Sequence, residues 1–181
     1  MNTLDVIKKR TSYRGKYKDI NVPRDDLIKI MEAGLAAPSG CNTQTTSLIA
    51  IDDVDLLKKV YKIAQVDEEN HAPAMICVLT QRLVAYRDGY GNDMYFNVHD
   101  YSAAIENMLL AIIDLGYESC WYEGYITDAD AIGRKMADAL GVPSDYELVC
   151  YLPVGVASEA TKHPDKKPFE ERAWFNGFKK T

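Results

Sequence analysis

Two arginines near the start of the chain lie four residues apart in the segment Arg10-Thr-Ser-Tyr-Arg14. A helical turn would place both guanidinium groups on one side, and Ser12 adds a hydroxyl donor between them. A phosphate monoester is close to a dianion and is bound best by several charge-assisted donors at once. This segment is a candidate phosphate site, and the alternative is a solvated basic helix end.

A second candidate is the stretch from Ala37 to Gln44, where small and turn-forming residues surround two carboxamides, Asn42 and Gln44. A carboxamide offers a donor and an acceptor side by side. This pairing matches the alternating N–H and C=O edge of a flavin's pyrimidine ring. The alternative is an ordinary loop between a helix and a strand.

The third candidate is Ser119-Cys-Trp-Tyr-Glu-Gly-Tyr125. Gly124 permits a close approach of the backbone, so that a backbone N–H there could hydrogen-bond a flavin N5, with Tyr or Trp as a wall. By itself the segment also fits an aromatic strand end. A fourth candidate is the lysine-rich run from Lys162 to Lys167, which offers a further phosphate cation or a solvated charged surface.

Several common catalytic motifs are missing. The sequence contains no GxGxxG after a strand, no GxxxxGK[ST], no HExxH and no GxSxG. His71, His99 and His163 are not spaced as metal ligands, and Cys41, Cys77, Cys120 and Cys150 form no CxxC pair, so we expect no metal site. An enzyme without these groups must take its reactivity from a bound cofactor.

Hydrophobic periodicity predicts the elements that position these segments. We expect helices at 3–10, 21–35, 55–64, 100–115 and from about 127 to 140, and strands at 47–51, 74–79, 119–122 and 147–156. The order mixes helices and strands without regular alternation. This predicts an α+β fold, with helices packed on one sheet, in a single domain over residues 1–181.

Three segments carry more specific expectations. The helix at 100–115 is apolar around nearly its whole circumference, which favours cover by a partner subunit. The residues 81–99 have no clear period, and residues 127–130 resemble a helix cap. The tail beyond Ser158 carries four aromatic residues, and we expect it to dock on the protein.

Composition limits the class of protein. The 181 residues have a formal charge of −6, which opposes nonspecific binding to nucleic acid or to an anionic membrane. No stretch is long and apolar enough to span a membrane, and the first ten residues lack an apolar signal core. We therefore expect a cytoplasmic protein with reduced thiols.

Taken in order, the four segments resemble those of the flavin-dependent nitroreductase family. Its RxSxR-type element corresponds to 10–14, its PSxxNxQ loop to 38–44, and its apolar helix leading to a strand near Glu-Gly corresponds to 100–124. Its basic C-terminal segment corresponds to Lys166-Lys167-Pro168. The resemblance covers almost the whole chain and implies a central, mostly antiparallel sheet flanked by helices, in an intertwined homodimer.

The resemblance also implies roles for individual residues. The phosphate and ribityl end of FMN would be held by Arg10, Thr11, Ser12 and Arg14. The backbone of Glu123 and Gly124, beside Tyr122, would lie at the flavin N5, and Lys166 or, as the second choice, Lys167 would add a cation. The flavin would lie at the dimer interface, where the other subunit would contribute Pro38, Ser39 and Gly40. Asn42 would meet the isoalloxazine edge, and Gln44 of the same loop would also bind the cofactor.

The implied activity is reduction of FMN by NAD(P)H, followed by reduction of a nitroaromatic, a quinone or a similar small electrophile in a ping-pong reaction. The alternatives are a specialised reductase of the dehalogenase type and a non-catalytic flavin-binding protein. Two departures stand out: Thr45 and Thr46 follow Gln44 where proline is usual, and lysine replaces the usual C-terminal arginine. The short segment before helix 100–115 argues against a large lid.

Overall fold

The computed structural model describes residues 2–178 and has a three-stranded antiparallel sheet at its centre. The strands are β1 (Thr46–Ile51), β2 (Ala74–Thr80) and β5 (Glu147–Val154), in the order β1-β2-β5. The helices are α1 (Thr3–Lys9), α2 (Arg24–Leu35), α3 (Val54–Ile63), α4 (Asn97–Asp114) and α5 (Ile132–Ala139). Short 3-10 turns are η1 (Gly40–Asn42), η2 (Glu68–Asn70) and η3 (Phe169–Glu171). The predicted α+β class is confirmed.

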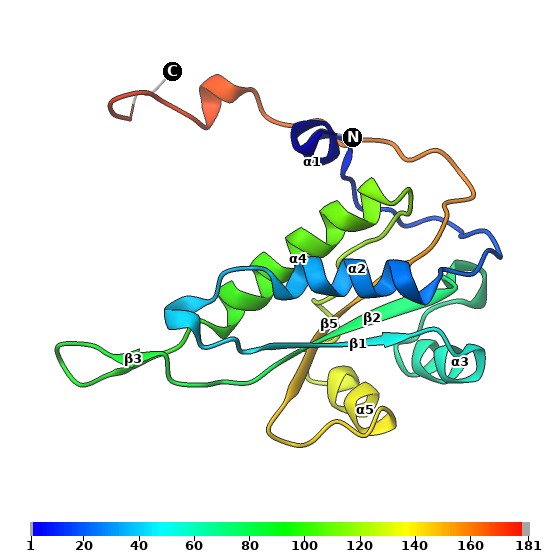
Figure 1. The fold of residues 1–181 in the computed structure, drawn as a ribbon, viewed down its shortest axis with the longest axis horizontal. Helices are drawn as coiled ribbons and strands as arrows, with labels where there is room; N and C mark the ends of the chain where they lie inside the picture. The colour runs from blue at the N-terminus through cyan, green and yellow to red at the C-terminus, as the bar shows by residue number, and fades with distance from the viewer. Residues whose placement is uncertain (1, 179–181) are drawn as a thin grey trace.

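The helices cover both faces of the sheet (Figure 1). Helices α2 and α4 pack on one face, and α3 and α5 pack on the other. The central strand β2 is buried along its whole length, because its side chains alternate between these two layers. The sheet therefore separates two apolar cores.

A β-bulge in β5 changes which side its residues face. The pairing with β2 runs from Val78 with Cys150 to Leu79 with Leu148, which leaves Val149 as the extra residue. Val149 and Cys150 consequently both belong to the α2–α4 core, and Tyr151 faces the α3–α5 side. The bulge thus determines where the Tyr151 ring lies.

Helix α4 corrects the expectation of apolar packing on nearly all sides. It begins at Asn97, and its buried residues face the sheet and α2. On the opposite side Glu106 is exposed and Asn107 is half-buried, next to small alanines. Because an alanine counts as apolar wherever it lies, the sequence pattern overstated the buried face of this helix.

Two further expectations were wrong in detail. The segment 119–122 is not a continuous strand, because it contacts β5 only through the isolated bridges Glu118–Gly155 and Tyr122–Tyr151. Helix α5 has no cap at 127–130; it begins at Ile132 after Ala131, whose φ of 52° is left-handed and which makes no side-chain capping bond.

Outside these layers the chain forms two extensions (Figure 1). The irregular segment 81–99 contains a small hairpin of β3 (Tyr86–Arg87) and β4 (Asp93–Met94), which projects from the body. The tail passes beside α1 to η3, and its Phe175 and Phe178 are more than 70% exposed. These rings are therefore not docked within a single chain, contrary to expectation. No helix within residues 2–178 is long and apolar enough to cross a bilayer.

The contact between α5 and β5 leaves no space at Gly133. A Cβ atom there would lie 2.4 Å from the backbone oxygen of Leu148 and 3.0 Å from that of Ile126. We predict that Gly133→Ala lowers the free energy of unfolding by about 2 kcal/mol or more, because backbone atoms cannot move aside cheaply. Urea denaturation measures this change. Gly89→Ala, at an open position of the hairpin, is the control, and equal stability of the two variants would contradict this packing.

Candidate active site

The segment 10–14 lies outside α1, which ends at Lys9, so its arginines do not share a helical turn. Burial alternates along the segment, so positions 10, 12 and 14 lie on its less buried side. Thr11 and Tyr13 point inward and are buried, whereas Arg10 and Ser12 are half-buried and Arg14 is exposed. The alternating burial is compatible with the predicted grouping, although the local structure is not the helical turn that we expected.

The first and third candidate segments lie side by side. The backbone N–H of Tyr13 donates to the carbonyl of Ser119 at 2.8 Å. Burial raises the pKa of the Cys120 thiol, while the charges of Arg14 and Arg10 act in the opposite direction, which places both arginines within electrostatic range of this residue. Thus Arg10 and Arg14 meet the segment 118–124.

The hydrogen-bond donors of this region are not fully occupied by partners among residues 2–178. Arg10 Nε lies 3.6 Å from Glu106 Oε1, in a contact that is partly open to solvent, and Arg14 makes a 3.5 Å bond to the Ser12 carbonyl. Ser119 Oγ is buried without a hydrogen-bond partner among residues 2–178. An oxyanion would satisfy such donors, so the residues present fit a phosphate group.

A cavity of about 420 Å³ opens beside these residues, on the α3–α5 side of the sheet. Arg14 and Tyr122, both predicted from the sequence, form part of its wall. Gln65 and Asn70 also line it, and no sequence pattern pointed to either residue. The cavity therefore combines one cation and two carboxamides, which can pair with a polar heterocycle, with three carboxylates, those of Asp67, Asp128 and Asp130.

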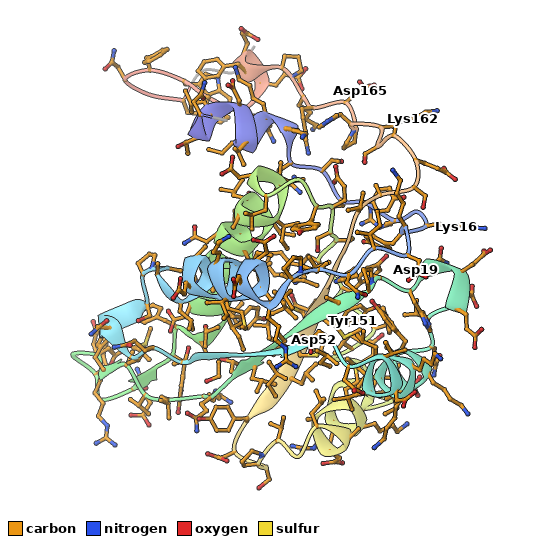
Figure 2. The ribbon with its side chains drawn as sticks, turned by 45° about the vertical axis from the view of Figure 1, so that its right-hand side comes forward. Lys16, Asp19, Asp52, Tyr151, Lys162 and Asp165 are labelled. Atoms are coloured by element: carbon orange, nitrogen blue, oxygen red, sulfur yellow. The ribbon has the colours of Figure 1, made fainter. Side chains whose placement is uncertain are left out.

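Aromatic rings form much of the remaining wall. Tyr122 stacks on Tyr151 with ring centres 5.0 Å apart, and the Tyr125 and Tyr151 hydroxyls are 2.6 Å apart. Figure 2 shows Tyr151 in the interior of the molecule. Burial raises the pKa of Tyr122 to about 12, so its phenol stays neutral at physiological pH. A planar, partly apolar ligand fits this wall.

Glu123 and Gly124 differ in how open they are to a ligand. The Glu123 carboxylate is occupied, because it accepts hydrogen bonds from the Tyr101 hydroxyl at 2.8 Å and from Trp121 Nε1 at 2.7 Å. Gly124 is exposed, and a Cβ atom there would meet nothing within 4 Å. The backbone at 123–124 is thus held by a buried network on one side and open to a ligand on the other.

The loop 38–44 does not join this group within one chain. It lies at the N-terminal end of α4, where Gly40 N–H donates to Asp100 at 2.7 Å, whereas the segment 10–14 lies toward the other end of that helix (Figure 1). Pro38, Ser39 and Gln44 line a separate pocket of about 200 Å³, and Asn42 is exposed. The predicted residues consequently form two separate groups.

The lysine-rich run lies on the extended tail, which leaves the sheet after β5. Figure 2 shows Lys162 and Asp165 on this tail, and Lys166 and Lys167 are exposed. The neighbouring His163 is close enough to Glu118 to influence its pKa. The tail thus passes near the segment 118–124. Within residues 2–178 no cluster of His, Cys, Asp and Glu is suited to a metal ion.

Known proteins resemble this chain over nearly its full length. A "Putative NADH dehydrogenase/NAD(P)H nitroreductase" of Archaeoglobus fulgidus is 29% identical over 170 residues, 93% of this chain and 89% of its own. The structure of a nitroreductase with bound FMN from Bacteroides fragilis NCTC 9343 is 26% identical, with a TM-score of 0.72 over 97% of this chain and 98% of the other.

A mammalian enzyme is a more distant relative. Mouse iodotyrosine deiodinase 1 is 24% identical over 190 residues, which are 90% of this chain and 65% of the enzyme. The model of the nitroreductase family itself matches residues 7–70 and 65–156, and these ranges include the segments 10–14, 38–44 and 119–125. The chain belongs to the nitroreductase family.

Proposed function

We propose that the chain is an FMN-dependent oxidoreductase that uses NAD(P)H to reduce nitroaromatics, quinones or similar small electrophiles. The observation that carries this proposal is the meeting of Arg10, Ser12 and Arg14 with the segment 118–124 beside a tyrosine-lined cavity. The FMN bound to the Bacteroides fragilis relative supports the choice of cofactor.

The arginine segment is suited to the phosphate end of FMN. Arg10, Ser12 and Arg14 are the less buried positions of this segment, so two guanidiniums and a hydroxyl can converge on one anion. Phosphate binding would displace the partly exposed contact between Arg10 and the Glu106 carboxylate. This loss costs little free energy, because exposed ion pairs are weak. On the tail, Lys166 or Lys167 would add a further cation.

The backbone at Glu123–Gly124 and the cavity beyond it are suited to the ring end. When bound, FMN supplies hydride transfer from NAD(P)H to the second substrate at one ring position. The protein's part is to hold the ring against Tyr122 and the open backbone of Gly124, and to exclude water with the aromatic wall. The name of the Archaeoglobus relative supports NAD(P)H as the donor.

A homodimer completes the site in this proposal. The loop that carries Asn42 and Gln44 is bonded to the first turn of α4 through Asp100, away from the contact of Arg10 with Glu106, so these carboxamides would reach a flavin held by a second copy. Exposed apolar side chains support such an interface. They are Leu4 and Ile7 on α1, Leu35 on α2, and Phe169, Phe175 and Phe178 on the tail.

NAD(P)H and the electron acceptor would occupy the same site beside the flavin in turn, as in a ping-pong reaction. The hairpin at 86–94 is small, which suits a site open to compact acceptors. Iodotyrosine deiodinase 1, as a relative, supports a second candidate function, the reductive removal of halogen from a phenol.

Loss of both arginines is the first test of the phosphate site. We predict that Arg10→Ala combined with Arg14→Ala weakens FMN binding by roughly 100-fold or more, because two charge-assisted contacts disappear. Fluorescence titration with FMN measures this affinity. Lys58→Ala removes a cation from α3 and is the control. Unchanged affinity in the double variant would contradict the assignment, and a wild-type protein that takes up no FMN would contradict the proposed function.

The acceptor is tested by steady-state turnover. The FMN-loaded protein is mixed with NADH or NADPH and with a nitroaromatic, a quinone or an iodinated phenol. We predict oxidation of the nicotinamide with parallel double-reciprocal plots, because the two substrates occupy one site in turn. Halide release without nitro or quinone reduction would favour the dehalogenase, and bound flavin that no nicotinamide bleaches would point to a non-catalytic protein.

A further inference from the structure

Both ends of the loop 38–44 are tied to one buried carboxylate. Asp100, in the first turns of α4, is 4% exposed. It accepts hydrogen bonds from Gly40 N–H at 2.7 Å and from the hydroxyl of Thr45, itself 2% exposed, at 2.8 Å. A longer bond of 3.4 Å comes from the hydroxyl of Thr43. Hydrogen bonds to an ionised acceptor are stronger than neutral ones, so the two shorter contacts form an effective clamp.

The backbone of this loop needs such a clamp. Cys41, Asn42 and Gln44 have φ values of 52°, 56° and 49°, in the left-handed region that residues with a Cβ seldom adopt. Conformations of this kind persist only where surrounding structure holds them, and they gather at functional sites. Inside the loop, Gln44 N–H donates to Ser39 Oγ at 3.0 Å, but the contacts to the rest of the protein include those of Asp100.

We propose that Asp100 is a positioning residue, which holds the loop 38–44 through Gly40 and Thr45 in the shape that presents Asn42 and Gln44 to the cofactor of a second subunit. This inference rests on the proposed function, because it supplies a cofactor for the two carboxamides. It also gives a role to Thr45: its hydroxyl joins the end of the loop to α4.

A simpler role for Asp100 is stabilisation of α4. An acidic residue near a helix N-terminus interacts favourably with the helix dipole. That role needs neither burial nor bonds to Gly40 and Thr45, and removal of the Thr45 hydroxyl would leave it intact. Substitutions at position 45 therefore separate the two roles.

The conservative variant Asp100→Asn provides a rescue. Its carbonyl oxygen can accept from Gly40 N–H, and its amide N–H can donate to the Thr45 hydroxyl, which also accepts. Asp100→Ala retains neither bond. Thr45→Ser keeps the hydroxyl, whereas Thr45→Val has a similar shape without it.

The experiment measures FMN dissociation constants for full-length variants, together with hydrogen exchange of the loop amides in the cofactor-free protein. We expect Thr45→Val and Asp100→Ala to bind FMN roughly tenfold or more weakly, as loss of a charged hydrogen bond implies. Exchange at Gly40 should become faster in both variants. Asp100→Asn and Thr45→Ser should stay close to wild type.

Thr80→Val is the matched control, because Thr80 is a buried threonine whose hydroxyl has no partner among the described residues. If Asp100→Ala fails to fold, Thr45→Val still decides the matter. Wild-type affinity in Thr45→Val, with unchanged exchange at Gly40, would overturn the inference. A wild-type protein that does not bind FMN would instead overturn the proposed function, which keeps the two failures distinct.

Discussion

Helix α4 separates the polar groups on which the proposed chemistry depends. Its first turn holds the loop 38–44 through Asp100, and Arg10 approaches Glu106 near the middle of the helix. Asp100 is buried and Glu106 is exposed, so the two groups lie on different sides of one rigid helix. In the proposed function these groups are two half-sites, which a second copy of the chain would combine around one ligand.

Small features of the backbone position the reactive surface. The buried side chains of Thr11 and Tyr13 leave Arg10 and Arg14 on the less buried side of their segment, and the bond from Tyr13 to Ser119 joins that segment to residues 118–124. In β5 the bulge at Val149 turns Tyr151 toward the cavity. Neither feature adds much stability by itself, but each determines which side chains face a ligand.

Strong periodic signals made much of the fold predictable. The helices at 3–10 and 55–64 and the strands at 47–51 and 74–79 agree with the structure to within a few residues. The predicted strand at 119–122 was wrong, because apolar residues beside a strand need not form a continuous ladder of hydrogen bonds. Candidate site residues could be named from the sequence where they form a local pattern, as at Arg10, and not at Tyr151 or Asp100, whose proposed roles depend on contacts distant in sequence.

Mixed dimers test most directly the claim that two chains share each flavin site. One variant carries Arg10→Ala and Arg14→Ala, and the other carries Asn42→Ala and Gln44→Ala. Each is colourless alone under this claim. Unfolding and refolding them together should restore about one FMN site in each mixed dimer, because one site receives both intact halves. Failure of the mixture to regain FMN, or full FMN binding by a monomer, would contradict a shared site.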